Sequence, residues 1–465
     1  MRNSFNLFSA NSLKPYFTIL STVKFEVSMR TLIMLFLITI FSCSSLSAQS
    51  GWFALDSGTT EDLYSVFFAD ENTGYKVGWN SAVLKTTNAG LNWFSQTLPF
   101  PNSRLWSVFF TDVNTGYIAG GVFGGNVYKT TNGGSNWDPI PLPITGDFFN
   151  VLFINSSTGY VGGSTNSFSI PVILKTTNAG NSWELQTVPS GMQIIFSINF
   201  LNENTGYATG GDPFVTSGNI LKTTNGGTNW QEIFFISNGA SVTSISFADA
   251  TTGVAVCGGT LDGTGGIFRT TNGGNNWTDL NYTTGSMRNL WSVKFLNSST
   301  GFIVGTTYSP DERGVILKTI NGGANWHNQN SNTNTFLTGC YFANENTGYV
   351  VGEYGRTLKT TDGGGSFVGI DPLNNEVPSQ IQLNQNYPNP FNPITKISFA
   401  IPGNSFVNLR IFDMMGREVA TLVNEQLQSG NYETEWNAAG IPSGTYFYKL
   451  TANNYSETMK MILIK

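Results

Sequence analysis

Short apolar segments separated by polar turns recur along most of this 465-residue chain. In the first copy, alternating apolar and polar residues predict a strand over Leu63–Phe68, and Asp70–Gly74 predicts the turn that follows it. Three more strands are predicted over Tyr75–Trp79, Ala82–Thr86 and Trp93–Thr97. Because no segment has the 3.6-residue apolar period of a helix, we expect an all-β protein.

This four-strand pattern occurs seven times, at intervals of 42 to 48 residues. A Thr-Gly corner marks each copy, at Gly74, Gly116, Gly159, Gly206, Gly253, Gly301 and Gly348. Four short antiparallel strands form one blade of a β-propeller, and a repeat of this length is typical of propellers. We therefore predict a seven-bladed β-propeller over residues 49–370. A strand at residues 51–55 is expected to close the ring, either in the outer position of the seventh blade or beside residues 367–370.

A second motif, Leu-Lys-Thr-Thr-Asn-Gly-Gly-x-Asn-Trp, lies between the third and fourth strands of each copy. Its turn residues are Asn88, Asn132, Asn178, Asn225, Asn272, Asn321 and Asp362. Its closing aromatic residues are Trp93, Trp137, Trp183, Trp230, Trp277, Trp326 and, in the last copy, Phe367. Asn bonds nearby backbone in turns, Gly adopts a positive φ without steric cost, and Trp supplies buried area. We interpret the motif as a structural turn rather than a ligand site.

These turns resemble the Asp-box, or BNR repeat, and the whole repeat resembles the propeller of photosystem II assembly and stability factors. The resemblance covers residues 52–370 and implies a protein-binding scaffold rather than an enzyme. In the photosynthetic members an arginine patch is thought to bind the client. Here the basic residues of the repeat fall once per blade at one strand position: Lys85, Lys129, Lys175, Lys222, Arg269, Lys318 and Lys359. That placement predicts a structural role and leaves a photosystem partner unsupported.

The composition of the chain changes after residue 370. Residues 371–380 are predicted to form a linker, and residues 381–465 alternate as in a small Ig-like β-sandwich. This segment resembles the type A C-terminal sorting domain of the type IX (Por) secretion system. The residues that carry the resemblance are Tyr387, Pro388, Asn389, Pro390, Phe391, Asn392, Pro393, Gly416, Gly444, Tyr446 and Lys465.

The resemblance to a sorting domain implies export across the outer membrane with the help of the type IX machinery. It also implies that a sortase removes the tag, and that the mature protein is released or attached to the outer-membrane surface. The alternative is an Ig-like adhesive module that stays on the mature protein.

Residues 1–48 are predicted to contain an N-terminal extension and a signal peptide. A basic start at Met29-Arg30 precedes an apolar run and small residues that end at Ala48, so we expect translation from Met29 and cleavage after Ala48. A lipoprotein cut before Cys43 is the alternative. The apolar run is short for a bilayer span, so no membrane span is expected in the mature chain.

Charge and composition narrow the class of function. The net charge of −6 becomes −9 without residues 1–48, which argues against a nucleic-acid ligand. The single histidine, His327, excludes a multi-histidine metal centre. Cys257 and Cys340 fall in non-adjacent blades, so we expect two buried free thiols rather than a disulfide. No cofactor is expected, and the protein is expected to be a monomer.

The loops between second and third strands vary most among the copies, and variable loops on a constant scaffold commonly carry binding residues. The candidate ligand-binding residues are Trp79, Phe168, Phe214, Tyr308, Asp311 and Arg313. Acids for glycoside hydrolysis could come from Asp212, Asp262, Asp311 and Glu312, but the opening motif of sialidases is absent.

We therefore predict a secreted or cell-surface, non-catalytic binding or scaffold propeller for an unknown protein or glycan. The alternatives are a sialidase-like or xyloglucanase-like glycoside hydrolase on the same propeller and a multivalent surface adhesin.

Overall fold

The computed structural model describes residues 51–99, 103–121, 125–165, 168, 170–212, 217–237, 240–258, 266–280, 288–307, 313–331, 333–365, 371–374, 378–403, 405–427 and 430–465. The expected leader lies outside these residues. Within them, no helix is long and apolar enough to cross a membrane.

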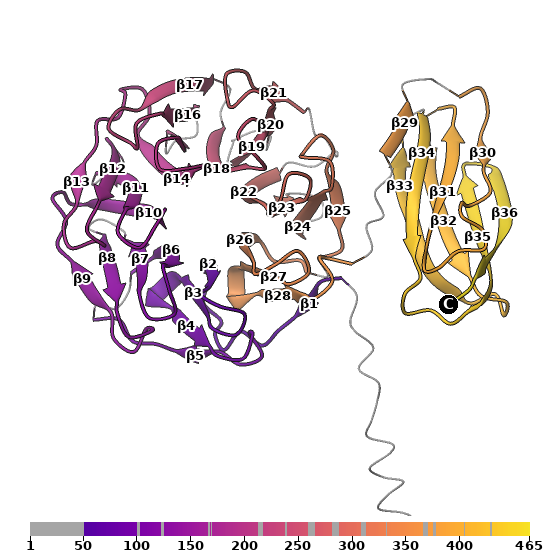
Figure 1. Cartoon of the computed structure of the whole chain (residues 1–465), viewed down its shortest axis with the longest axis horizontal. Helices are drawn as coiled ribbons and strands as arrows, with labels where there is room; N and C mark the ends of the chain where they lie inside the picture. The colour runs from indigo at the N-terminus through magenta and orange to yellow at the C-terminus, as the bar shows by residue number, and fades with distance from the viewer. Residues whose placement is uncertain are drawn as a thin grey trace, which may run out of the picture. The chain divides into compact units, whose positions relative to one another are not determined.

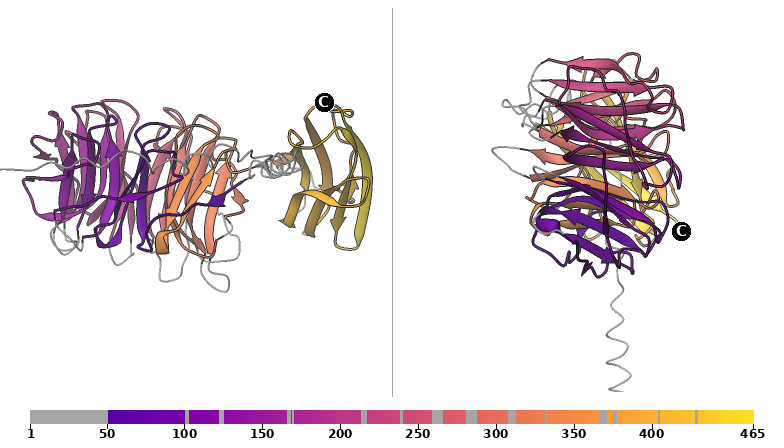
Figure 2. Two further views of the ribbon diagram at one scale, coloured as in Figure 1. Left: turned by 90° about the horizontal axis from the view of Figure 1, so that it is seen from below. Right: turned by 90° about the vertical axis from the view of Figure 1, so that its left-hand side faces the viewer.

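Among the described residues, the strands between residues 53 and 360 form seven four-stranded antiparallel sheets. The sheets stand as blades around one axis, with β2, β6, β10, β14, β18, β22 and β26 innermost (Figure 1). Figure 2 shows the same ring from its edge. The predicted seven-bladed β-propeller is therefore confirmed.

The first four blades follow the chain in order. Blade 1 contains β2 (Leu63–Phe68), β3 (Gly74–Gly78), the 3-10 turn η1 (Trp79–Ser81), β4 (Val83–Thr86) and β5 (Phe94–Ser95). Blade 2 contains β6 (Leu105–Phe110), β7 (Gly116–Gly120), β8 (Asn126–Thr130) and β9 (Asp138–Ile140). Blade 3 contains β10 (Gly146–Phe153), β11 (Gly159–Thr165), β12 (Pro171–Thr176) and β13 (Glu184–Leu185). Blade 4 contains β14 (Ile194–Phe200), β15 (Gly206–Gly211), β16 (Gly218–Thr223) and β17 (Gln231–Ile236).

The remaining three blades include the one that joins both ends of the ring. Blade 5 contains β18 (Ser241–Phe247), β19 (Gly253–Gly258), β20 (Ile267–Thr270) and β21 (Thr278–Asp279). Blade 6 contains β22 (Arg288–Phe295), β23 (Gly301–Thr307), β24 (Arg313–Thr319) and β25 (His327–Gln329). Blade 7 contains β26 (Leu337–Phe342), β27 (Gly348–Gly352), the turn η2 (Glu353–Gly355), β28 (Thr357–Thr360) and, from the start of the propeller, β1 (Phe53–Ala54).

The fourth strand of blade 1, β5, is shorter at both ends than the sequence predicts. The Trp93 ring just before it is buried and meets Phe68 edge-on at 5.9 Å between centroids. The first strand has the predicted bounds, whereas the second begins at Gly74 and ends at Gly78, before the turn that holds Trp79.

Each Thr-Gly corner needs glycine because a phenylalanine ring lies against its backbone. A Cβ on Gly74 would lie 2.6 Å from the Phe68 ring, and a Cβ on Gly348 would lie 2.3 Å from the Phe342 ring. The same approach, under 3.0 Å, occurs at all seven corners. Any larger residue would therefore push apart the first and second strands of its blade.

Neighbouring blades are joined by a recurring pair of side chains. Tyr75 of β3 stacks on Phe110 of the next blade with centroids 3.8 Å apart. The Tyr75 hydroxyl donates to the Gly133 carbonyl oxygen at 2.9 Å, and Lys85 Nζ donates to the same oxygen at 2.6 Å. In every blade the equivalent lysine or arginine donates to the next turn in this way. The once-per-blade basic residues therefore hold the ring together.

The ring closes through residues 51–55. Phe53 pairs with Lys359 of β28, so β1 is the outer strand of blade 7. Trp52 is 2% exposed and meets Phe342 edge-on at 5.9 Å. The turn-motif tryptophans of the other blades meet their first-strand phenylalanines at 5.9 to 6.3 Å. Trp52 thus occupies the position that the sequence assigned to Phe367, which lies outside the described residues.

Two polar contacts reinforce this closure. The amide of Gly51 donates to both carboxylate oxygens of Asp362, at 3.0 and 3.2 Å. Because an asparagine offers only one acceptor oxygen, this contact accounts for the acid in the seventh turn. Lys76, which is fully buried in blade 1, donates from Nζ to the Ser57 carbonyl at 3.1 Å and to Thr357 Oγ1 at 3.0 Å. Burial lowers the pKa of Lys76 to about 7.

The C-terminal strands form two further four-stranded sheets around one apolar core. The first sheet contains β29 (Asp371–Asn374), β34 (Gly430–Asn437), β31 (Ile394–Ile401) and β30 (Gln382–Leu383). The second contains β33 (Glu418–Leu427), β32 (Ser405–Phe412), β35 (Gly444–Ala452) and β36 (Tyr455–Leu463). The fold is consistent with the predicted Ig-like sandwich.

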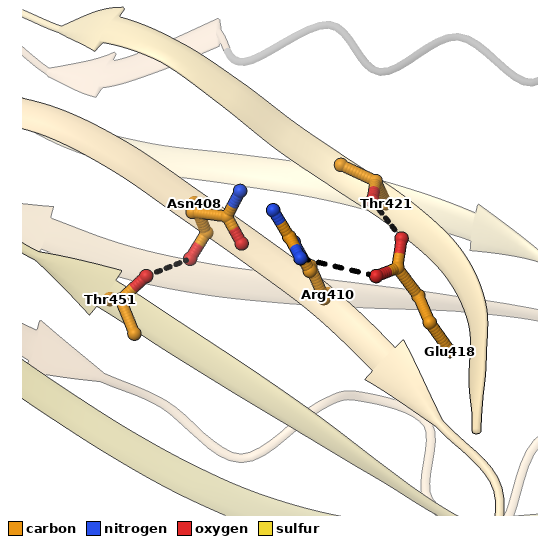
Figure 3. Close-up of polar contacts among 5 residues, drawn as sticks. All are labelled: Asn408, Arg410, Glu418, Thr421 and Thr451. Atoms are coloured by element: carbon orange, nitrogen blue, oxygen red, sulfur yellow. Dashed lines mark hydrogen bonds and ion pairs between the residues drawn. The ribbon is translucent and has the colours of Figure 1, made fainter. Parts of the chain in front are cut away.

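Polar contacts cover part of the second sheet. Arg410 Nη1 lies 3.2 Å from Glu418 Oε2, Thr421 bonds the same carboxylate, and Thr451 Oγ1 donates to the Asn408 carbonyl oxygen (Figure 3). The contacts of Glu418 with Arg410 and Thr421 are exposed, so they add little to stability.

Candidate functional site: an aromatic pocket on the propeller axis

The innermost strand of every blade contains one extra residue. In blade 1 the register of β2 and β3 shifts between Leu63 and Ser65, which leaves Tyr64 outside the ladder. The same shift occurs in the other blades. The residues at this bulge position are Tyr64, Trp106, Phe149, Phe196, Thr243, Trp291 and Thr338. A bulge redirects its side chain away from the ladder, here toward the axis of the ring.

Four of these rings form a continuous series, which we call the aromatic arc: Tyr64, Trp106, Phe149 and Phe196. Tyr64 and Trp106 stack with centroids 4.5 Å apart and an interplanar angle of 27°. Trp106 and Phe149 lie 5.4 Å apart, and so do Phe149 and Phe196. The arc therefore spans blades 1 to 4, and every ring in it is only partly buried.

The arc is one wall of a cavity of about 550 Å³ to which all seven first strands contribute. This volume lies within the range of ligand-binding pockets. Trp291 and Phe336 add two more rings, and serine, threonine and asparagine side chains add polar atoms. The pocket therefore combines a large apolar surface with a few polar groups, which is the usual make-up of a ligand site.

Several of the polar lining residues serve the scaffold. Ser107 Oγ accepts a hydrogen bond from the Val151 amide at 3.2 Å, and Ser244 Oγ accepts one from the Val293 amide at 3.2 Å. Both bonds run from one blade to the next, so these hydroxyls hold the strands that carry the bulge.

The charged groups of the described lining are two carboxylates. Asp212 follows β15 in blade 4, and Glu353 follows β27 in blade 7. Arg104 lies beside the pocket, with its guanidinium 4.1 Å from the Trp79 ring centroid and 5.7 Å from that of Trp106. Burial raises the pKa of Tyr64; nearby Arg104 opposes this rise, whereas Asp62 and Glu353 add to it.

None of the six candidate ligand-binding residues from the sequence belongs to the described lining of this pocket. Trp79 is 39% exposed and stacks on Arg104, and Phe168 lies 6.2 Å from Phe149 of the arc. Arg313 is exposed at the start of β24. Phe214, Tyr308 and Asp311 lie outside the described residues, as do Asp262 and Glu312. The arc itself was not predicted from the sequence, although its aromatic residues recur at one position of the repeat.

The turn motifs have a geometry that needs no ligand. In the first copy, Thr86 Oγ1 accepts from the amides of Asn88 and Gly90, and Asn88 Oδ1 accepts from the Asn92 amide at 3.0 Å. Ala89, between them, has a φ of 55°. The same bonds recur in the following five copies, so we interpret the motif as a structural turn.

Both described cysteines are free. Burial raises the pKa of Cys340, which lines the pocket, to about 11, and burial raises that of Cys257 further. A thiol with such a pKa is almost entirely protonated at neutral pH and is a poor nucleophile. No group of three or more metal-ligating side chains occurs among the described residues.

Part of the sorting motif joins the start of the C-terminal domain to its last strand. Phe391 is buried against Trp436, and its backbone bonds the strand of the C-terminus at Ile462 and Ile464, each at 3.0 Å. Tyr446 donates to the Pro442 carbonyl at 2.7 Å. Gly416 has a φ of 75° at the hairpin tip between β32 and β33.

The other sorting-motif residues are more exposed. Tyr387 is 80% exposed, and its bond to Pro388 is cis. The Lys465 amide donates to Ser443 Oγ at 3.0 Å, and Lys465 Nζ bonds the Ala439 carbonyl. The contacts of Lys465 hold the end of the chain beside residues 439–443, whereas those of Phe391 hold the C-terminal strand beside the start of the domain.

Family models match both parts of the chain. The model described as photosynthesis system II assembly factor YCF48 matches residues 44–145 and 134–292, which together make up more than half of the chain. The chain belongs to this family. The model described as secretion system C-terminal sorting domain matches residues 385–465. That domain marks proteins exported by type IX secretion and engages the type IX machinery. The protein is therefore located at the cell surface or outside the cell.

Solved structures share the propeller fold. YCF48 bound to a D1 peptide is 18% identical, with a TM-score of 0.52 over 67% of this chain and 97% of that one. YCF48 from Cyanidioschyzon merolae is 20% identical, with a TM-score of 0.53 over 67% and 99%. A GH74 xyloglucanase from Xanthomonas campestris is 12% identical, with a TM-score of 0.49 over 89% and 68%. At these identities the likeness to the two YCF48 structures concerns the fold alone. None of the curated proteins matches the chain in sequence.

Proposed function

We propose that this protein is a non-catalytic peptide-binding propeller that acts outside the cell, with the axial pocket as its binding site. The observation that carries the proposal is the bulge in all seven first strands, which directs five aromatic and two threonine side chains into one cavity. Exposed aromatic rings around a preformed cavity are costly for a soluble protein unless they serve binding. The YCF48 relative bound to a D1 peptide supports a peptide as the class of ligand.

The sorting domain serves delivery in this proposal. A signal peptide within residues 1–48 directs the chain across the inner membrane, and a sortase removes residues 381–465 after outer-membrane passage. Intact-mass analysis of the protein from the cell surface and medium of its native host tests this. The expected mass lacks both the leader and the sorting domain. A mature protein that still ends at Lys465 would make the sandwich a permanent part of it.

A glycoside hydrolase on the same scaffold is the second candidate, because Asp212 and Glu353 both line the pocket. Glycoside hydrolysis commonly uses two carboxyl groups on opposite sides of the scissile bond. Incubation of the purified protein with xyloglucan and sialylated glycans, followed by measurement of released sugar, separates the candidates. Turnover that is lost in both Asp212→Asn and Glu353→Gln would replace the binding proposal with the hydrolase.

A further inference from the structure

The pocket wall differs from one side of the ring to the other. The aromatic arc occupies blades 1 to 4, whereas the two carboxylates follow β15 of blade 4 and β27 of blade 7. In the β14–β15 pair Gly211 lies opposite Ile194, so Asp212 is at the end of β14 that leads to Phe196 of the arc. At the other end of the arc, the turn η2 that holds Glu353 meets blade 1, where the Tyr354 amide donates to Asp62 Oδ1 at 2.9 Å, two residues before Tyr64. Asp212 therefore lies at one end of the arc and Glu353 at the other.

The described lining contains six aromatic rings, two carboxylates, and no lysine or arginine. The face of an aromatic ring carries a negative partial charge and attracts cations, and carboxylates attract them more strongly. Both kinds of group therefore favour a positive ligand and disfavour an anionic one. The net charge of −9 expected after loss of residues 1–48 adds to this attraction over longer distances.

The molecule already holds one cation beside this pocket. The guanidinium of Arg104 lies over Trp79 at 4.1 Å and near Trp106 at 5.7 Å, and its Nε is buried without a hydrogen-bond partner among the described residues. A guanidinium is therefore already in contact with the ring of Trp79, beside the arc. Phe149 and Phe196, farther along the arc, have no such described cation over their rings, and the cavity lies in front of them.

We propose that the axial pocket binds a lysine or arginine side chain of an extended peptide, with its aliphatic stem along Phe149 and Phe196 and its cationic head toward Asp212 or Glu353. This inference rests on the proposed peptide-binding function and specifies the charge of the ligand. An alkyl stem matches the apolar rings, and a terminal cation matches the carboxylates, so a single side chain satisfies both parts of the wall. A neutral or acidic side chain satisfies only the first.

The test is a titration of the mature secreted protein, followed by tryptophan fluorescence and calorimetry. The probes are a blocked Gly-Ser-Arg-Ser-Gly peptide and the same peptide with citrulline, which keeps the shape of arginine but has no charge. We expect the arginine peptide to bind at least about tenfold more tightly than the citrulline peptide. The free energy of a desolvated cation–π contact corresponds to about one factor of ten in affinity. Its affinity should also fall as salt is raised.

Variants locate the site. The double variant Asp212→Asn/Glu353→Gln and the single variant Phe149→Ala should each weaken binding of the arginine peptide several-fold. Glu184→Gln, on the exposed outer strand β13, should leave the affinity unchanged. Equal affinity for the citrulline peptide, tighter binding of a Gly-Ser-Glu-Ser-Gly peptide, or no binding of the arginine peptide would each overturn the inference. Equal arginine and citrulline affinities that both fall in Phe149→Ala would leave the proposed function standing without the charge preference. Binding of neutral oligosaccharides alone would overturn both.

Discussion

Replacement of Trp52 by alanine should open the propeller at its closing seam. Trp52 is 2% exposed and meets two rings edge-on, Phe302 at 6.2 Å and Phe342 at 5.9 Å. A buried tryptophan removes about 150–250 Å² from water, which at about 25 cal/mol per Å² sets an upper value near 4–6 kcal/mol. Large-to-small changes of this kind cost about 3–5 kcal/mol because the cavity collapses only partly. We therefore expect Trp52→Ala to lower the free energy of unfolding by about 3–5 kcal/mol.

Urea unfolding of the mature chain, followed by tryptophan fluorescence, measures this loss. Ten of the eleven tryptophans lie between residues 52 and 326, so the signal reports mainly on the propeller. Phe94→Ala is the control, because Phe94 is 63% exposed on the outer strand of blade 1 and should cost less than about 0.5 kcal/mol. If both variants lost less than about 1 kcal/mol, residues 51–55 would not hold the ring closed and the reasoning would be refuted.

Three further changes test the scaffold. Gly348→Ala should lower the free energy of urea unfolding by about 1–3 kcal/mol, because the new Cβ would lie 2.3 Å from the Phe342 ring. Gly403→Ala in the full chain is the control and should leave it nearly unchanged, because no atom lies within 4 Å of the new Cβ. Ala89→Gly should raise the melting temperature slightly. Ala89 has a left-handed φ of 55°, and this conformation costs alanine about 1–2 kcal/mol. That strain exceeds the stability lost because glycine makes the unfolded chain more flexible. Between pH 7 and the ordinary lysine pKa of 10.5, Lys76 keeps its proton in the unfolded chain but has released it in the folded protein. The free energy of unfolding should therefore rise with pH over this range. In urea unfolding measured from pH 6 to 10, Lys76→Met should remove that rise.

Local sequence signals predicted most of the scaffold. The apolar alternation predicted the first strand of blade 1 with its observed bounds. The number of Thr-Gly corners predicted the number of blades. Of the two positions predicted for the strand at residues 51–55, the structure has the outer position of blade 7. The contact of Trp52 with Phe342 was not predicted, because only the closed ring brings the two residues together. Lys76 was missed for a similar reason, since its burial depends on residues 57 and 357, far from it in sequence.

The aromatic arc was missed because period-two alternation assumes an unbroken ladder. A strand without a bulge would place Tyr64 on the face of the blade opposite to Leu63 and Ser65, inside the stack of blades. The register shift instead removes Tyr64 from the ladder. The extra residue is a feature of pairing between two strands, so neither strand alone reveals it.

The bulge also explains how one repeat can serve both structure and binding. Residues that join blades recur in nearly identical form, because each must match the turn and the ring of its neighbour. A bulge residue lies outside the ladder, so the ring geometry permits several side chains there. Where that residue is threonine it serves the scaffold: Thr243 and Thr338 donate to carbonyl oxygens of the next blade at 2.6 Å. The aromatic residues at the same position in blades 1 to 4 form the arc instead, so the repeat differs between blades at a position that faces the pocket.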